Sequence, residues 1–357
     1  MRKTSLLYYG LIIIFTNLFA LNCHSQDLLD VKVEQRPFDY FKLFEPKKEH
    51  PIKSIIYLQN NLVRPDTITK EIFTKDGKKL KYFSFQKGKL SSITDYKYFP
   101  EQNAYLWEQR YFDKSKYFYT SKTIKNKAGK DLSFYNTTIL NGDTISRQYA
   151  NFNYNSEGLL VKREDGHDKL IALMRSYEYL GNDMVLAKTY TNPNSQDFYS
   201  AVAYQYNKEH LPIEKKAYLV RNGKADPALY SYYTYDNGLL IEEKYQGYDD
   251  KAKVTETTVN YQYNIKKQLI KLNASVDSIY KNIEYQYEGN KLKKVTIKTN
   301  TQIRLNREEF VYVDRTIETP FIFEKNFEYD EFGNLILIKE LLNGQIYREF
   351  IKTISYF

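Results

Sequence analysis

Several stretches of the chain alternate between apolar or aromatic residues and polar residues. Ile283, Tyr285 and Tyr287 share one parity, whereas Glu284 and Gln286 share the other. A period of two is expected of a β-strand that buries one face. No segment keeps the apolar spacing of three and four residues that marks an amphipathic helix. The pattern therefore predicts an all-β chain without a long helix.

One unit recurs from about residue 150 onward. It consists of an aromatic residue, any residue, a second aromatic residue, a short polar loop, a leucine and another alternating strand. Unit starts at 152, 177, 204, 233, 261 and 285 are separated by 24 to 29 residues, and such self-similarity is typical of a repeat architecture. The sequence thus predicts consecutive antiparallel β-hairpin repeats that form an elongated or curled sheet. The repeat-defining aromatic residues are Phe152, Tyr154, Tyr204, Tyr206, Tyr233, Tyr235, Tyr261, Tyr263, Tyr285, Tyr287, Phe327 and Tyr329.

The loop between the two strands of a unit is rich in residues that tolerate left-handed backbone angles. Many loops carry glycine, as at Gly158 and Gly333, and Asn or Asp follows the second aromatic residue in most copies. These residues favour hairpin loops of three to five residues. Two copies have His210 or Gln268 before the leucine instead of glycine, which predicts that the turn geometry varies between copies.

The unit resembles the YD repeat of the RHS family, in which Tyr, any residue and Tyr-Asp precede a loop with Gly and then Leu. The closest matches are 233–239 and 327–335, and the resemblance covers roughly residues 150–340. It implies strands that wind into long sheets or closed shells, and membership of a family that includes cell-surface proteins linked to carbohydrate binding. The last repeat is followed by few residues, so we do not expect a complete shell around a toxin.

The sequence divides into three expected regions. Residues 1–25 read as a signal peptide, 26–125 as a divergent N-terminal β region, and 126–357 as the YD-like β-hairpin repeat region. Within the second region, 52–59, 67–73 and 80–85 read as strands, and Asp76-Gly77 is a strong hairpin signal. A small separate N-terminal domain is the alternative.

The N-terminus predicts export. Arg2 and Lys3 precede a mostly apolar stretch from Leu6 to Leu21, the layout of a secretory signal, and this stretch is shorter than the ~20 residues of a spanning helix. We expect cleavage before Gln26 and no transmembrane segment in the mature chain. A lipid anchor at Cys23, the only cysteine, is the second processing route. The expected location is periplasmic, outer-membrane-associated or extracellular.

Candidate chemistry is sparse. The four histidines have no partner at metal-ligand spacing, and acidic doublets such as Glu242-Glu243 point to opposite faces of a strand. No glycine-rich phosphate loop or nucleophile motif is present. The sequence therefore predicts no catalytic residue, no cofactor and no metal. A net charge of +9 comes mostly from scattered lysines, and we do not expect nucleic acid as a partner of an exported protein.

Two function classes follow. The first is a non-enzymatic exported repeat protein that binds a glycan, an envelope component or a protein partner through its sheet. The second is an envelope enzyme, similar to a glycoside hydrolase, whose carboxylates come from separate strands. Alternating tyrosines favour the first class, because their rings suit both packing and contact with sugars.

Overall fold

A computed structural model describes residues 51–61, 64–86, 88–112, 117–168, 170–191, 199–221, 224–248, 254–276, 279–300 and 321–357. The expected signal peptide and the lipid anchor at Cys23 lie outside these residues. Within the described part the chain forms 22 strands and one short 3₁₀ turn, η1 (Pro100–Gln102). None of its helical segments has the length and hydropathy needed to cross a membrane.

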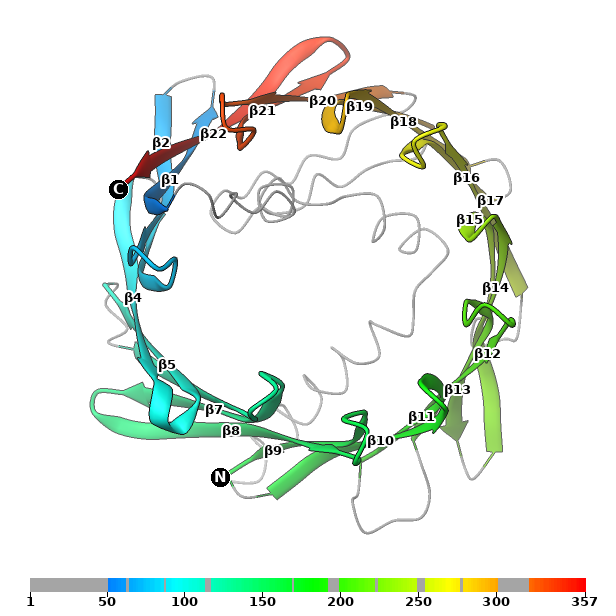
Figure 1. Cartoon of the computed structure of the whole chain (residues 1–357), viewed down its shortest axis with the longest axis horizontal. Coiled ribbons are helices and arrows are strands. Elements are labelled where there is room, and N and C mark those ends of the chain that lie inside the picture. The colour runs from blue at the N-terminus through cyan, green and yellow to red at the C-terminus, as the bar shows by residue number, and fades with distance from the viewer. Residues whose placement is uncertain are drawn as a thin grey trace, which may run out of the picture. The chain divides into compact units, whose positions relative to one another are not determined.

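The strands follow one another along the chain with short turns between most of them (Figure 1). They are β1 (Ile52–Asn61), β2 (Arg64–Phe73), β3 (Lys79–Gln86), β4 (Lys89–Phe99), β5 (Ala104–Tyr111), β6 (Tyr117–Lys125), β7 (Asp131–Leu140), β8 (Asp143–Tyr154), β9 (Leu160–His167), β10 (Leu170–Leu180), β11 (Asp183–Tyr190), β12 (Ser200–Tyr206), β13 (Pro212–Arg221), β14 (Lys224–Asp236), β15 (Leu239–Tyr248), β16 (Val254–Tyr263), β17 (Leu269–Val276), β18 (Ile279–Glu288), β19 (Lys291–Thr299), β20 (Phe321–Tyr329), β21 (Leu335–Leu342) and β22 (Gln345–Tyr356). The predictions of an all-β fold and of strands at 52–59, 67–73 and 80–85 are confirmed.

The described residues belong to two compact units. Among the described residues, the middle unit comprises Glu178–Lys188 and the part of the chain within Asp197–Asn282. The terminal unit comprises the described residues within Arg36–Tyr177, Thr189–Gln196 and Ile283–Phe357. In the middle unit, β12 to β17 pair in sequence order, each antiparallel to the next. These pairings confirm the predicted consecutive antiparallel hairpins.

The terminal unit contains strands from both ends of the described chain. β1 to β10 pair in sequence order, and so do β19 to β22. β1 also pairs with β22, from Ile52↔Tyr356 to Asn60↔Glu349, and Figure 1 draws the two strands side by side. Because of this pairing neither β1 nor β22 has a free edge. Residue 126, the expected start of the repeat region, lies in the turn between the paired strands β6 and β7.

Each strand has two chemically different faces. In β16, Val259 is buried and Tyr261 and Tyr263 are half-buried, whereas Asn260 and Gln262 are exposed. We call the side of the sheet to which the repeat aromatic residues point the aromatic face, and the opposite side the polar face. Residues of other strands belong to the same face as their cross-strand partners. The predicted division of these five residues between a packed side and a solvated side is confirmed.

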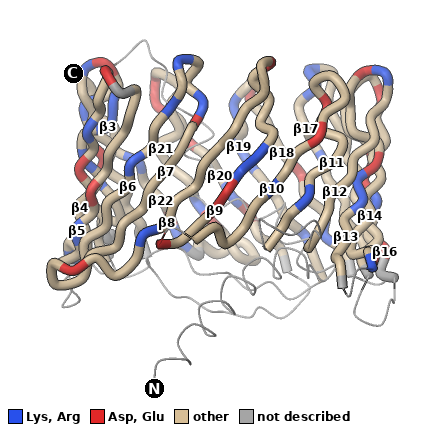
Figure 2. Tube along the Cα trace, turned by 90° about the horizontal axis from the view of Figure 1, so that it is seen from below, with Lys and Arg blue, Asp and Glu red and all other residues tan. Residues whose placement is uncertain are grey.

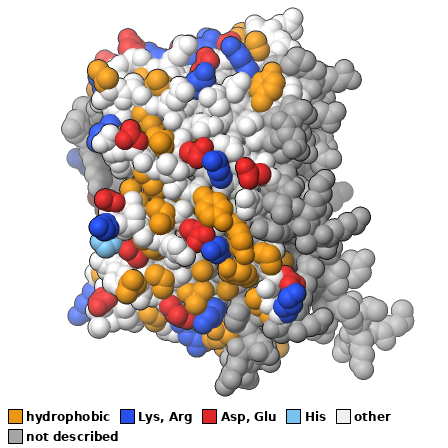
Figure 3. All heavy atoms as spheres, turned by 90° about the vertical axis from the view of Figure 1, so that its right-hand side faces the viewer, with side chains coloured by type: hydrophobic (Ala, Val, Ile, Leu, Met, Phe, Trp, Pro, Cys, Tyr) orange, Lys and Arg blue, Asp and Glu red, His pale blue; other side chains and the backbone are white. Residues whose placement is uncertain are grey.

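Charged side chains on the polar face pair across strands. Lys97 Nζ lies 3.1 Å from Glu108 Oε2, and Asp95 contacts both Lys81 at 3.1 Å and Arg110 at 3.6 Å. Figure 2 shows acidic and basic residues interspersed along the strands. In Figure 3 hydrophobic side chains of the middle unit lie between acidic and basic ones. Charges of both signs at central strand positions suit a face that meets water, because facing hydrocarbon would cost several kcal/mol for each buried charge.

The second aromatic residue of a repeat lies at an irregularity of the ladder. The register shifts just before Tyr154, Tyr206, Tyr235, Tyr263 and Tyr329. Each of these five hydroxyls donates a hydrogen bond of 2.8 to 3.0 Å to a backbone carbonyl of an earlier hairpin. The accepting carbonyls belong to Asp131, Met184, Pro212, Leu240 and Leu292. A bulge therefore aims each tyrosine at the hairpin before it, and the bond ties neighbouring repeats together.

The turns that follow Tyr154, Tyr206 and Tyr263 share one geometry, although only the first contains glycine. The turn after Tyr235 differs, with positive φ at two successive residues, 47° at Asn237 and 77° at Gly238, so the predicted variation between copies is present but does not depend on the missing glycine. Asn155 N donates to Leu159 O at 2.9 Å, and Asn264 N donates to Gln268 O at 3.0 Å. The fourth turn residue has a positive φ in each case, 79° at Gly158, 61° at His210 and 60° at Lys267. The asparagine side chain stabilises the loop by accepting bonds from backbone N–H groups two and four residues later, and this allows a non-glycine residue at the strained position.

Candidate functional site: a pocket on strands β20 to β22

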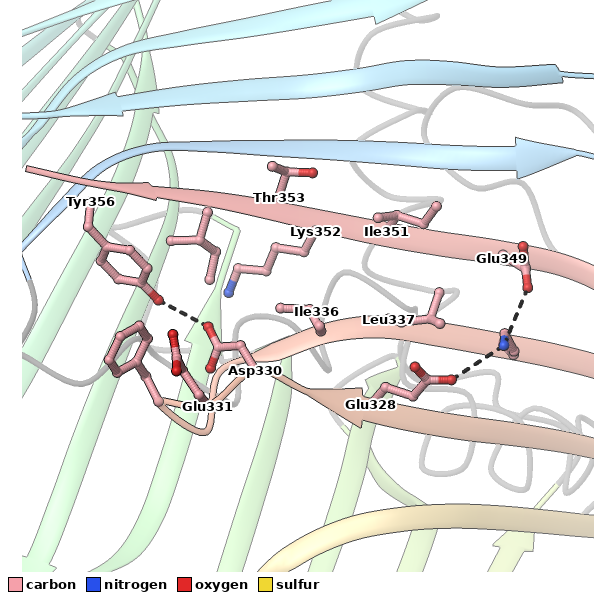
Figure 4. A pocket seen from close by; sticks show the side chains of 13 residues that line it. Glu328, Asp330, Glu331, Ile336, Leu337, Glu349, Ile351, Lys352, Thr353 and Tyr356 are labelled. Carbon is pink, nitrogen blue, oxygen red and sulfur yellow. Dashed lines mark hydrogen bonds and ion pairs between the residues drawn. The ribbon is translucent and has the colours of Figure 1, made fainter.

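The pocket of interest lies in the terminal unit on β20, β21, β22 and the turn between β20 and β21 (Figure 4). Its volume is about 610 Å³, within the range of small-ligand sites. The lining residues are Glu328, Asp330, Glu331, Phe332, Ile336, Leu337, Lys339, Glu349, Ile351, Lys352, Thr353, Ile354 and Tyr356.

The middle of the pocket is apolar. Leu337 of β21 pairs with Ile351 of β22 on one side and with Glu328 of β20 on the other. Cross-strand partners point to the same side of a sheet, so the three form one row on the polar face. Ile336 adds a further aliphatic side chain. A ligand here meets an aliphatic surface with charged groups around it.

A lysine between two carboxylates forms one charged edge of the pocket. Lys339 Nζ lies 3.3 Å from Glu328 Oε1 and 4.0 Å from Glu349 Oε1, as the dashed lines in Figure 4 show. Glu328 is exposed and Glu349 is half-buried. Carboxylate oxygens at this edge can accept hydrogen bonds from ligand hydroxyls.

The opposite end of the pocket is built around Asp330. Its Oδ2 accepts hydrogen bonds from Tyr356 OH at 3.0 Å and from Asn334 Nδ2 at 3.0 Å, and Asn334 Nδ2 also donates to Tyr356 OH at 2.7 Å. Asp330 Oδ1 in turn accepts from the backbone N–H of Asn334 at 2.7 Å. Burial acts to raise the pKa of Asp330, but the hydrogen bonds from Asn334 and Tyr356 outweigh it and hold the pKa below its usual value. Burial, together with the bond to Asp330, raises the pKa of Tyr356 to about 12.

Two aromatic rings meet at this end. The rings of Phe332 and Tyr356 lie edge to face, with centroids 5.2 Å apart and planes at 70°. The Asp330 bond fixes the Tyr356 hydroxyl, so its ring is held in one orientation at this end of the pocket. Because the hydroxyl proton of Tyr356 is already bonded to Asp330, the residue contacts a ligand through the apolar surface of its ring and not through its hydroxyl.

A buried lysine stands between the two ends. Lys352 is 2% exposed, and Figure 4 shows its side chain directed toward Asp330. Burial lowers the pKa of Lys352, an effect that the charges of Glu71 and Asp330 partly oppose. The carboxylates of Glu71 and Asp330 thus favour the charged form of Lys352 against the cost of its burial.

A buried ion cluster lies on the aromatic face of the same three strands. Lys325, Glu340 and Arg348 pair directly across β20, β21 and β22. Lys325 Nζ lies 3.2 Å from Glu340 Oε1, and Arg348 Nε donates to Glu340 Oε2. Burial acts to raise the pKa of Glu340, but the two cations outweigh it and lower the pKa. The cluster fixes the three strands relative to one another beneath the pocket.

None of the twelve repeat-defining aromatic residues lines this pocket. Phe327, which is 2% exposed, and Tyr329 belong to β20 but lie on the aromatic face, and Tyr329 OH is bonded to Leu292 O. No motif in the sequence points to Phe332, Lys352 or Tyr356 as binding residues. One sequence signal was available for Lys352. It shares strand parity with Phe350, Ile354 and Tyr356, and a charged residue on the side of a strand that is otherwise apolar indicates a buried partner of opposite charge.

Other candidate chemistry stays dispersed. Glu242 and Glu243 point to opposite faces, since Glu243 is 1% exposed on the aromatic face while Glu242 pairs with Lys244 at 3.2 Å. His210 pairs with Asp183, and His167 lies beside Asp168 and Ser146. Among the described residues no three His, Cys, Asp or Glu side chains gather in a way that could hold a metal ion.

No protein-family model matches the chain, and no curated protein matches it in sequence. Among solved structures it is similar to TcdB2-TccC3-TEV at 11% identity with a TM-score of 0.32, over 78% of this chain and 19% of that one. It is also similar to a porin-like protein from Bacteroides uniformis at 8% identity with a TM-score of 0.30, over 86% of this chain and 97% of that one. A porin-like protein from Bacteroides vulgatus gives 12% identity and a TM-score of 0.27, over 86% and 99%. The chain thus spans less than a fifth of the TcdB2-TccC3-TEV chain.

Proposed function

We propose that the chain is an exported, non-enzymatic β-repeat protein of the YD/RHS-like kind that binds a saccharide in the β20–β22 pocket. The main support is the arrangement at one end of the pocket. There the ring centroids of Phe332 and Tyr356 lie 5.2 Å apart, and the Tyr356 hydroxyl donates a hydrogen bond of 3.0 Å to Asp330 Oδ2. A fixed aromatic ring packs against the C–H face of a sugar, and nearby carboxylates accept bonds from its hydroxyls.

The ionic contacts of the pocket favour binding over hydrolysis. Glycoside hydrolysis needs one carboxylic acid held in its protonated form. Hydrogen bonds keep the pKa of Asp330 low, and Glu328 and Glu349 both lie beside the ammonium of Lys339. These carboxylates suit the role of hydrogen-bond acceptors for a bound sugar.

Calorimetric titration of the mature chain with neutral disaccharides, cellobiose and chitobiose, tests the proposal. We expect saturable binding that Tyr356→Ala weakens at least about tenfold, as loss of one stacking ring and its fixed hydroxyl implies. Tyr135→Ala is the matched control, because Tyr135 is 45% exposed on β7 of the same unit and lies outside the pocket.

A second variant tests the same pocket in case Tyr356→Ala does not fold. Thr353 is exposed at the pocket, so Thr353→Trp fills the space without removing a buried contact. We expect it to abolish binding and to leave the melting temperature unchanged. Binding that survives both substitutions would exclude this pocket, and cleavage of the disaccharide during titration would favour the enzyme alternative.

A further inference from the structure

Two arginines lie directly opposite each other on neighbouring strands of the terminal unit. Arg163 of β9 pairs with Arg175 of β10, and Phe152 of β8 pairs with Arg163 on the other side. Cross-strand partners point to the same side of the sheet, so both guanidinium groups lie on the aromatic face. Like charges in this position destabilise a sheet unless an anion stands between them.

One carboxylate is present for the two cations. Asp165 Oδ1 accepts bonds from Arg163 Nε at 2.9 Å and Nη2 at 2.6 Å, and Asp165 Oδ2 accepts from Arg175 Nη1 at 3.1 Å. The neighbouring charges Lys162 and Glu164 belong to the other face and pair with each other at 2.6 Å. The cluster therefore keeps one net positive charge.

This charge is only partly hydrated. The side chains of Arg163 and Arg175 are 34% and 27% exposed, and that of Asp165 is 25% exposed. A partly buried cation without a full counter-charge loses hydration without recovering it. The two arginines are accessible from solvent and carry one positive charge more than Asp165 balances. A dissolved anion can therefore reach them and is stabilised there.

The donors of the pair suit an oxyanion. Each guanidinium carries five N–H groups in a planar fork, and Asp165 engages only Nε and Nη2 of Arg163 and Nη1 of Arg175. The Cζ atom of Arg163 lies 5.3 Å from the centroid of the Phe152 ring, and this cation–π contact helps to hold the guanidinium group in one orientation. Forks of this kind bind carboxylate, sulfate or phosphate through paired hydrogen bonds.

We propose that Arg163 and Arg175 form a binding site for one oxyanion group, a carboxylate, sulfate or phosphate, which balances the charge that Asp165 leaves. None of these residues lines the β20–β22 pocket, so the inference does not rest on the proposed saccharide site.

Thermal unfolding of the mature chain with sodium sulfate, sodium phosphate or sodium glucuronate, against sodium chloride at equal ionic strength, tests the site. A ligand that binds the folded state raises the melting temperature with its concentration. We expect at least one of the three oxyanions to do so. A response to sulfate or phosphate alone identifies a tetrahedral group, and a response to glucuronate alone identifies the carboxylate of a sugar acid.

Three substitutions separate a binding site from a structural ion pair. Arg175→Gln should weaken the oxyanion at least about tenfold, and Asp165→Asn should strengthen it several-fold, because the competing carboxylate is gone. A purely structural cluster would instead be destabilised by Asp165→Asn without any gain in anion affinity. Arg110→Gln is the matched control, since the Arg110 side chain is 62% exposed on β5 and contacts a single carboxylate at 3.6 Å.

If Arg175→Gln fails to fold, Arg175→Lys keeps the charge and removes the fork, and should still weaken the oxyanion. The proposal is overturned if no oxyanion raises the melting temperature above the chloride value, or if Arg110→Gln reduces the response as much as Arg175→Gln does.

Discussion

At the scale of single residues, tyrosine has both a packing and a hydrogen-bonding role. Tyr261 OH donates to Glu243 Oε2 at 2.9 Å, and Glu243 is 1% exposed on the adjacent strand. Burial raises the pKa of Tyr233 to about 12, and the charge of Glu243 adds to this effect. The aromatic face of the middle unit therefore stabilises a carboxylate by surrounding it with phenol groups rather than by excluding charge.

Replacement of Tyr261 should reveal both roles. Tyr261→Ala removes the packed ring and is expected to lower the free energy of unfolding by ~3–5 kcal/mol. Tyr261→Phe removes only the bond to Glu243 and should cost ~1–3 kcal/mol. The exposed Gln262→Ala should stay within ~0.5 kcal/mol. Denaturant titration of the three variants measures the differences, and equal small effects would mean that the aromatic face is solvated.

At the scale of the element, the repeated turn determines which residues are under strain. Lys267 holds a φ of 60° at the place where Gly158 has 79°, and a left-handed angle costs a residue with a Cβ about 1 kcal/mol. An asparagine five residues before the start of the next strand, as at Asn155, Asn207 and Asn264, marks this turn in copies with and without glycine.

Glycine at this position should therefore stabilise the protein. Lys267→Gly is expected to raise the free energy of unfolding by ~0.5–1 kcal/mol, because the strain is relieved at an exposed site. Lys266→Gly, one position earlier in the same turn and without a positive φ, should lower it by a similar amount. Paired melting curves decide the matter, and a loss of stability in both variants would contradict the strain argument.

Another copy of the turn carries a pH-sensitive contact within the middle unit. His210 Nδ1 lies 2.8 Å from Asp183 Oδ2, and this hydrogen bond together with the Asp183 charge raises the pKa of His210 above its ordinary value of 6.5. A raised pKa means that the folded state binds the proton more tightly than the unfolded chain. The stabilisation is complete below the ordinary pKa and is lost as pH rises through the raised one.

The variant His210→Asn tests this contact, since asparagine tolerates the left-handed angle but does not titrate. We expect the wild-type advantage in melting temperature to be largest below the ordinary pKa of 6.5 and to shrink as the pH rises above it. A difference between the two proteins that does not change with pH would exclude the Asp183 pair as its cause.

At the scale of the whole molecule, the sequence predicts those features that depend on residues close together in the chain. Alternation at Val259, Tyr261 and Tyr263 predicts the packed side of β16, and Asp76-Gly77 predicts the β2–β3 turn, because both depend on neighbours in the chain. The burial of Lys325 and Glu340 could not be predicted in this way, since it depends on which strands lie side by side. The pairing of β1 with β22 has no signature in either strand for the same reason.

Export gives the prediction that involves the whole chain. The n-region and apolar stretch of the N-terminus lead us to expect a mature protein that starts at Gln26. The predominance of strands in the described residues leads us to expect a far-ultraviolet circular dichroism spectrum without helical bands. Mass spectrometry of the expressed protein checks the first expectation. A diacylglycerol thioether on Cys23 would instead identify a lipoprotein.

The β1–β22 pairing also determines when the terminal unit can finish folding. Phe357 N donates to Pro51 O at 3.1 Å, so the two ends of the described chain meet only after β22 has left the ribosome. Contacts between distant parts of a chain form slowly, because the loop entropy is lost before they add stability. A chain that ends at Gly344 would leave β1 and β21 as unpaired edges that invite aggregation. The order of synthesis thereby keeps the terminal unit incomplete until the twelve-residue strand β22 has been made.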